Sequence, residues 1–165
     1  MLPFLGMENP NIRFLMGQLE ATFAGTPWYG DPVMKKLEEI PHSHVMEVPM
    51  GLSNSVAKLV RHMIVWREYT LRKIAGDAVL KIELNTPDDW PAVDINTAAD
   101  WEALVQWLKT TQEQLLEALR DKPDAWFSQT VPGKPQESFR ELLEGIIHHD
   151  VYHLGQLVLV AKLVR

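Results

Sequence analysis

The sequence predicts an all-α protein, a four-helix bundle, and three observations lead to this prediction. Four long segments carry apolar residues at steps of three and four, the spacing of a helix with one buried face. Capping and terminating residues bound each of these segments. No segment keeps the two-residue alternation of a strand for long enough to build a sheet core. The length of 165 residues suits one domain, so a single domain over residues 1–165 is expected.

The first predicted helix begins at Asn9 and Pro10 and ends near Gly25. Asparagine is a good N-cap, proline is favoured at the first helical position, and glycine often follows the end of a helix. A short helix over residues 31–40 follows, because an Asp-Pro pair repeats the same starting signal. Residues 41–51 lack a helical pattern and are expected to form a loop.

The second long helix is expected to begin at Ser53 or Asn54, which are both good N-caps, and to end at Gly76. The connection after it, Asp77 to Asn96, is long, contains two prolines and has no helical pattern. A four-helix bundle with one long crossover between its second and third helices accommodates such a connection.

Capping boxes open the last two predicted helices. Thr97 and Asp100 form such a pair at the start of the third helix, which ends before Pro123. Ser138 and Glu141 form the second pair, and the helix that follows runs almost to the end of the chain. The segment between these two helices holds a turn signal and is expected to be a loop.

Composition excludes several classes of function. The net charge of −6 repels phosphate backbones, so no nucleic-acid partner is expected. The absence of cysteine excludes disulfides, cysteine zinc sites and a thiol nucleophile from the chain itself. The first six residues do not resemble a signal peptide, and the most apolar segment, residues 154–164, is too short to cross a membrane. A cytoplasmic protein with no membrane partner is therefore expected.

Two histidines of the last helix are candidates for metal binding. His149 and His153 are four residues apart, so they lie on nearly the same face, offset by about 40°. They interrupt an apolar row and should face the core, where their nitrogens need partners. One metal ion satisfies both imidazoles, but hydrogen-bonded core histidines remain an alternative. His148 points away from this pair.

A third candidate, His62, lies along a largely apolar row of the second long helix. A single histidine in such a row is more often a packed core residue than a ligand, and spacing alone does not connect it to the last helix. His42 and His44 fall in the loop and are expected to be exposed and without function.

Two segments resemble the DinB-like (DinB/YfiT-type) family of metal-binding four-helix bundles: residues 59–68, Leu-Val-Arg-His-Met-Ile-Val-Trp-Arg-Glu, and residues 149–157, His-Asp-Val-Tyr-His-Leu-Gly-Gln-Leu. The resemblance implies that His62, His149 and His153 together hold one divalent metal ion. It also implies an up-down-down-up order of helices, and homodimers are frequent in the family. Three neutral imidazoles suit zinc or nickel, with manganese, iron or cobalt as further options.

The same resemblance implies an enzyme that uses a low-molecular-weight thiol such as bacillithiol, mycothiol or glutathione. The hypothesis is therefore metal-dependent transfer of this thiol to a small electrophilic substrate. The lack of cysteine is compatible with it, because the cosubstrate supplies the nucleophile. The alternatives are a non-catalytic metal-binding stress-response protein and a metal-dependent hydrolase, for which no carboxylate base can be placed.

Four polar residues near the histidines receive separate expectations. Tyr152 is a weak catalytic candidate, and an aromatic residue at the bundle interface is the favoured interpretation. Gln156 is expected to support a ligand or to pack. Glu68 is expected in a surface ion pair, and Asp150 is expected to cap a neighbour or to face solvent.

Overall fold

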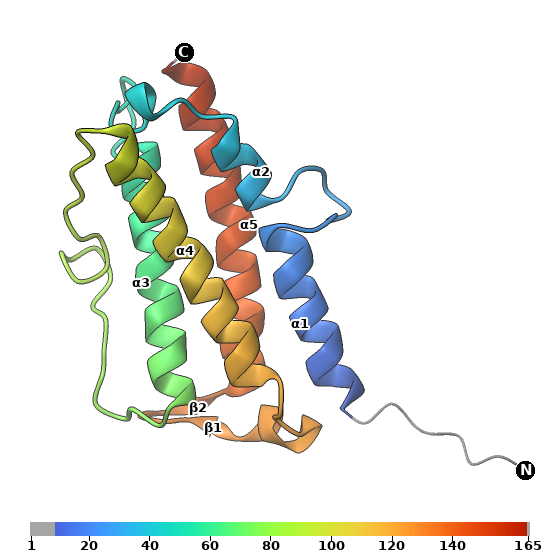
Figure 1. Cartoon of the computed structure of the whole chain (residues 1–165). Helices are drawn as coiled ribbons and strands as arrows, with labels where there is room; N and C mark the ends of the chain where they lie inside the picture. Colours follow the sequence, from blue (N-terminus) through green and yellow to red (C-terminus); the bar gives the residue numbers. More distant parts are fainter. Residues whose placement is uncertain (1–8, 165) are drawn as a thin grey trace, which may run out of the picture.

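The computed structural model describes residues 9–164, and the N-terminal stretch for which no signal peptide is expected lies outside this range. It contains four long helices, α1 (Pro10–Phe23), α3 (Val56–Ile74), α4 (Ala98–Leu119) and α5 (Phe139–Leu163). The smaller elements are a short helix, two 3-10 turns and a two-stranded hairpin (Figure 1): α2 (Val33–Glu38), η1 (His42–His44), η2 (Asp124–Ser128), β1 (Thr130–Val131) and β2 (Lys134–Ser138).

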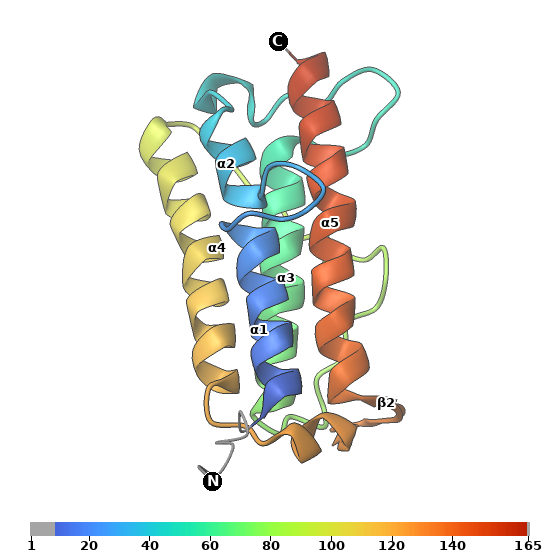
Figure 2. The same ribbon diagram turned by 90° about the vertical axis from the view of Figure 1, so that its right-hand side faces the viewer.

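The four long helices pack as a bundle in which α3 contacts α4 and α5, and α1 contacts the same two helices. Helices α1 and α5 run in one direction, whereas α3 and α4 run in the other (Figures 1 and 2). The chain between α3 and α4 returns along the outside of the bundle (Figure 1). The predicted four-helix bundle, its up-down-down-up order and its long crossover are therefore confirmed.

The helix boundaries follow the capping residues in most cases. Both predicted capping boxes are present, at Thr97 with Asp100 and at Ser138 with Glu141. The cap of α3 is Ser55, whose hydroxyl accepts a bond from the Lys58 amide, so the prediction of Ser53 or Asn54 was early by one or two residues.

The predicted start of α1 is confirmed, because Asn9 is its N-cap residue and Pro10 its first helical residue, but the Asn9 side chain makes no capping bond to that helix. The carboxylate of Asp124 in η2 instead accepts bonds from the amides of Asn11 and Ile12, at 3.1 and 3.0 Å. A cap supplied from 112 residues away in the chain has no local signal in the sequence.

The hairpin lies in a segment that was expected to be a loop. Its strands are short and pair in an antiparallel manner around a turn at Gly133, which has a φ of +76°. A side chain at Gly133 would overlap the backbone of Ala78, so this position needs glycine. The Lys73 ammonium donates to the carbonyls of Asp77 and Pro132, at 2.8 and 2.9 Å, and fastens the hairpin to the end of α3.

The apolar core has two parts, one at each end of the bundle. One cluster joins α2 and the first half of α3 to the end of α5, and the other joins α1, η2 and the hairpin to the start of α5. Buried polar side chains gather between the two clusters, where α3, α4 and α5 meet: His62, Arg67, Gln112, Asp150 and His153. Over residues 9–164, no helix combines the length and the apolar character needed to cross a membrane.

Candidate metal centre

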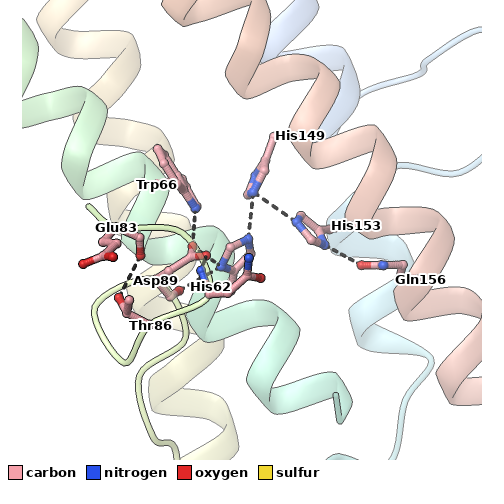
Figure 3. Close-up of polar contacts among 9 residues, drawn as sticks. His62, Trp66, Glu83, Thr86, Asp89, His149, His153 and Gln156 are labelled. Carbon is pink, nitrogen blue, oxygen red and sulfur yellow. Dashed lines mark hydrogen bonds and ion pairs between the residues drawn. The ribbon is translucent and has the colours of Figure 1, made fainter. Parts of the chain in front are cut away.

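Three histidine side chains converge between two helices of the bundle (Figure 3). His62 comes from α3, and His149 and His153 come from α5. The Nε2 atom of His149 lies 3.0 Å from Nε2 of His62 and 3.0 Å from Nε2 of His153. The ligand atoms of all three residues lie within 4.8 Å of one another.

These histidines meet because of two separate packing arrangements. The four-residue spacing places His149 and His153 on one face of α5, and this face packs against α3 at the level of His62. His62 and His153 are only 4% and 3% exposed, whereas His149 is partly exposed. Of the three residues, His149 is therefore the one with the most solvent contact.

The crossover segment holds the ring of His62. Its Nδ1 atom lies 2.8 Å from the carbonyl oxygen of Asp89 and 3.1 Å from the carboxylate of the same residue. The indole of Trp66 donates to this carboxylate at 2.9 Å, and the ring of Trp90 stacks on His62 at 3.7 Å (Figure 3 shows the polar contacts). Both oxygens of Asp89 near Nδ1 act as acceptors, so Nδ1 carries the proton and Nε2 keeps a free lone pair.

A glutamine holds the ring of His153 in the same way. The Oε1 atom of Gln156 lies 2.6 Å from Nδ1 of His153, and its amide nitrogen donates to the hydroxyl of Tyr152 at 3.2 Å. In this orientation of the amide Oε1 faces His153 and accepts, so Nδ1 of His153 donates and its Nε2 is free as well. The expected supporting role of Gln156 agrees with this geometry.

Burial keeps the three imidazoles neutral. It lowers the pKa of His149 to about 2, with further lowering by the neighbouring histidines and by Arg67. It also lowers the pKa of His153 to about 4, although the bond to Gln156 opposes this shift. Burial lowers the pKa of His62 against the opposing effect of Asp89. Neutral imidazole is the form that binds a metal ion.

The donor set fits a divalent cation. Nε2 of His62 and Nε2 of His153 each have a free lone pair, and both lie 3.0 Å from Nε2 of His149. A single proton on Nε2 of His149 can make only one well-aligned hydrogen bond. One cation can satisfy all three nitrogens, and the two pairs that lie 3.0 Å apart already have the separation of atoms that each lie about 2.0–2.1 Å from one ion, the usual Zn–N distance. Within residues 9–164 this group contains three histidines and no carboxylate, a number of protein ligands that leaves open positions.

The other histidines lie outside the cluster, as expected. His148 is exposed on α5, and His42 and His44 are exposed in η1. The Nδ1 atom of His44 lies 2.7 Å from the Glu47 carboxylate.

The two acidic residues that received expectations differ in outcome. Glu68 forms the expected surface ion pair, at 3.9 Å from Arg61. The expectation for Asp150 was wrong, because this residue is fully buried and forms two 2.6 Å bonds with the Arg67 guanidinium. Helix α5 contacts α1 on one side and α3 on the other, so its buried surface is wider than the single apolar row that the sequence shows.

Tyr152 does not lie at a helix interface within the bundle, since it is 64% exposed. Its ring contacts that of His153 edge-on, with 5.0 Å between centroids, and it supports Gln156.

Asp89 and Trp90 are the residues of the site that the sequence did not reveal. They lie in a segment without helix or strand, where the spacing of residues does not indicate in which direction their side chains point. The available signal was the rule that a ligating histidine donates its other nitrogen to an oxygen.

The fold and the cluster define a helical-bundle protein with a buried three-histidine centre. A family model described as the DinB superfamily matches residues 33–157, and the chain belongs to this superfamily. The match extends from α2 into α5 and includes all three histidines. No curated protein and no solved structure matches the chain. The single domain over residues 1–165 stays a prediction.

Proposed function

We propose that the protein binds one divalent metal ion through Nε2 of His62, His149 and His153, with zinc or nickel favoured over manganese, iron or cobalt. The observation that supports this most is the convergence of three neutral imidazoles, two of which have their outer nitrogens held by Asp89 and Gln156. Such outer partners raise the basicity of a ligand and fix its orientation.

We further propose that the protein is a thiol S-transferase whose activity depends on the bound ion. When bound, such an ion lowers the pKa of a thiol or a water that reaches it. The chain contains no cysteine, so the sulfur comes from a low-molecular-weight thiol of the bacillithiol, mycothiol or glutathione type. In the reaction the sulfur forms a bond to an electrophilic carbon of the substrate, the leaving group departs with its bonding electrons, and the thiol proton passes to solvent.

A metal-binding stress-response protein without turnover is the second candidate, favoured by the burial of His62 and His153. Metal binding would then stabilise the bundle by joining α3 to α5. The hydrolase alternative has less support. It needs a carboxylate base, and the nearest carboxylate, Asp89, already accepts bonds from Trp66 and the Asn85 amide.

Elemental analysis of protein purified without a chelating tag tests the metal site. We expect about one equivalent of metal in the wild type, a strong loss in His62→Ala and His149→Ala, and no loss in His148→Ala. His148 is the matched control because it is an exposed histidine on the same helix. Equal metal content in all four proteins would rule out the proposed site.

Activity assays separate the two candidate functions. Each of the three thiols is combined with a panel of electrophiles, and formation of the thioether is followed by mass spectrometry. A transferase gives turnover that chelation removes and the metal restores. The non-catalytic candidate is supported if metal binding stabilises the protein but the metal-loaded protein shows no turnover with any pair of thiol and electrophile.

We also propose that the protein forms a homodimer. The exposed side of α5 carries Tyr152, Leu159 and Leu163, which are large apolar residues spaced for one face of a helix. Light scattering should give twice the mass of the chain for the wild type and a monomer for Leu159→Glu. A monomeric wild type at all concentrations would contradict this proposal.

A further inference from the structure

A small pocket opens beside the metal centre, between α3, α5 and the hairpin. Its volume is about 200 Å³, below the range of about 300–1,000 Å³ that is usual for drug-sized ligands. Its walls are mostly apolar, and one end is formed by His149, the member of the histidine cluster that solvent reaches. The lining residues that matter below are Trp66, Tyr69, Lys134, Gly145 and His149.

Two buried polar atoms of the lining residues lack a partner in the described part of the chain. The hydroxyl of Tyr69 has no acceptor for its proton although the residue is only 2% exposed, since its polar neighbour is the Lys134 ammonium, which can only donate; Nδ1 of His149 is buried and unbonded as well. An unpaired buried polar group costs about 1–3 kcal/mol, so each calls for an explanation. Tyr69 donates through its hydroxyl, and His149 donates through Nδ1 when its Nε2 binds the metal.

Positive charge surrounds the tyrosine. The ammonium groups of Lys73 and Lys134 lie 5.4 and 5.5 Å from the centre of the Tyr69 ring. Lys134 pairs with Glu137 at 3.1 Å, whereas Lys73 is buried and contacts two carbonyls and no carboxylate. An oxygen acceptor with partial or full negative charge therefore fits this end of the pocket.

We propose that this pocket binds the electrophilic substrate, and that this substrate is a small planar molecule whose carbonyl or carboxylate oxygen accepts a bond from the Tyr69 hydroxyl. That the bound molecule is a substrate rests on the proposed transferase function. That the pocket binds such a molecule rests on the pocket alone. The aromatic walls, Trp66 and Tyr69, contact the planar body. Because His149 lines the pocket, this body would lie beside the proposed metal site.

Binding can be measured without turnover. Acetophenone and ethylbenzene have nearly the same shape and differ in the carbonyl oxygen, and benzoate adds the charged form of the acceptor. Titration of the metal-free and the zinc-loaded protein is followed by NMR shifts of the Trp66 indole. We expect acetophenone or benzoate to bind more tightly than ethylbenzene, and Tyr69→Phe to weaken that ligand roughly three- to tenfold, the effect of one hydrogen bond. The same variant should leave ethylbenzene unchanged.

A glycine pair on α5 supplies a variant that blocks the pocket and its control. A Cβ atom built at Gly145 or at Gly155 meets nothing within 4 Å, so a side chain can start from either helical position without a clash at its Cβ. Only Gly145 lines the pocket. Gly145→Leu should abolish binding of acetophenone and benzoate while it keeps the metal content, and Gly155→Leu should keep both properties.

The outcomes separate this inference from the proposed function. Wild-type affinity in both Gly145→Leu and Tyr69→Phe, or equal affinity for acetophenone, benzoate and ethylbenzene, overturns the pocket assignment even if metal binding and thiol transfer are found. Loss of binding in Gly145→Leu, together with a protein that holds no metal, supports the pocket and overturns the proposed metal-dependent function.

Discussion

The buried ion pair between Arg67 and Asp150 gives a quantitative test of how the polar layer of the bundle is built. The side chains are 0% and 1% exposed, and two 2.6 Å bonds join the guanidinium to both carboxylate oxygens. Gln112 of α4 accepts a third bond from the same guanidinium at 3.1 Å, so the group joins three helices. Asp150→Asn removes the negative charge and leaves the guanidinium buried without a counterion.

Removal of one partner from a buried pair costs about 3–5 kcal/mol, because the remaining charge is unpaired in a medium of low polarity. For a domain of this size, this free energy corresponds to a fall in Tm of roughly 6–20 °C. The loss is smaller than the usual stability of about 5–15 kcal/mol, so the variant should still fold. Urea unfolding followed by circular dichroism measures it as a lower midpoint with an unchanged slope.

Glu144→Gln is the matched control, because it is the same chemical change on the same helix. Glu144 pairs with Arg140 at 3.5 Å, and both side chains are nearly half exposed, so the change should be within about 0.5 kcal/mol. Replacing both buried partners, as Arg67→Met with Asp150→Leu, should cost less than the sum of the single changes. A loss below about 1 kcal/mol for Asp150→Asn, or strict additivity in the double variant, would refute the reasoning.

Three further predictions follow from the same structure. Asp89→Ala should weaken zinc binding about 10- to 100-fold, because the carboxylate orients His62; competition with a chelator measures this, and an unchanged affinity would show that the crossover does not support the site. Zinc at 100 times its dissociation constant should stabilise the wild type by about 2.7 kcal/mol and His62→Ala by much less, as seen in thermal unfolding; equal stabilisation of both proteins would place the ion elsewhere. The bonds from Ser138 lower the pKa of Glu141 below 4.5, so the stability that this cap provides is present above pH 4.5 and is lost as the pH falls through the lower folded-state value. Glu141→Gln should therefore lose less stability than the wild type between pH 6 and pH 3 in urea unfolding, and parallel curves for the two proteins would count against this cap.

The bundle could be predicted because the signals that define its helices lie close together in the sequence. Capping boxes at Thr97 and Ser138 fix the starts of α4 and α5, and the apolar rows indicate which faces are buried. The hairpin was missed because its first strand has only two residues, too few to show a pattern. The bonds that Asp124 accepts from the first amides of α1 were missed because tertiary packing brings this residue to the helix.

The candidate site was only partly predictable from the residues. Spacing paired His149 with His153, but only the resemblance to a family joined His62 to them, since the contact between α3 and α5 has no signal along the chain. Asp89 lies in a segment without periodicity, so its bond to His62 emerges only in three dimensions. Asp150 was misjudged because a charged residue is usually exposed, and its buried partner Arg67 is 83 residues away.

The central claim is that the three imidazoles hold one ion between α3 and α5. Crystals of untagged protein, grown with stoichiometric zinc and measured at the zinc absorption edge, test it most directly. We predict one anomalous peak per chain, bonded to Nε2 of His62, His149 and His153. A peak at any other position, or none while these nitrogens stay hydrogen-bonded to one another, would contradict it.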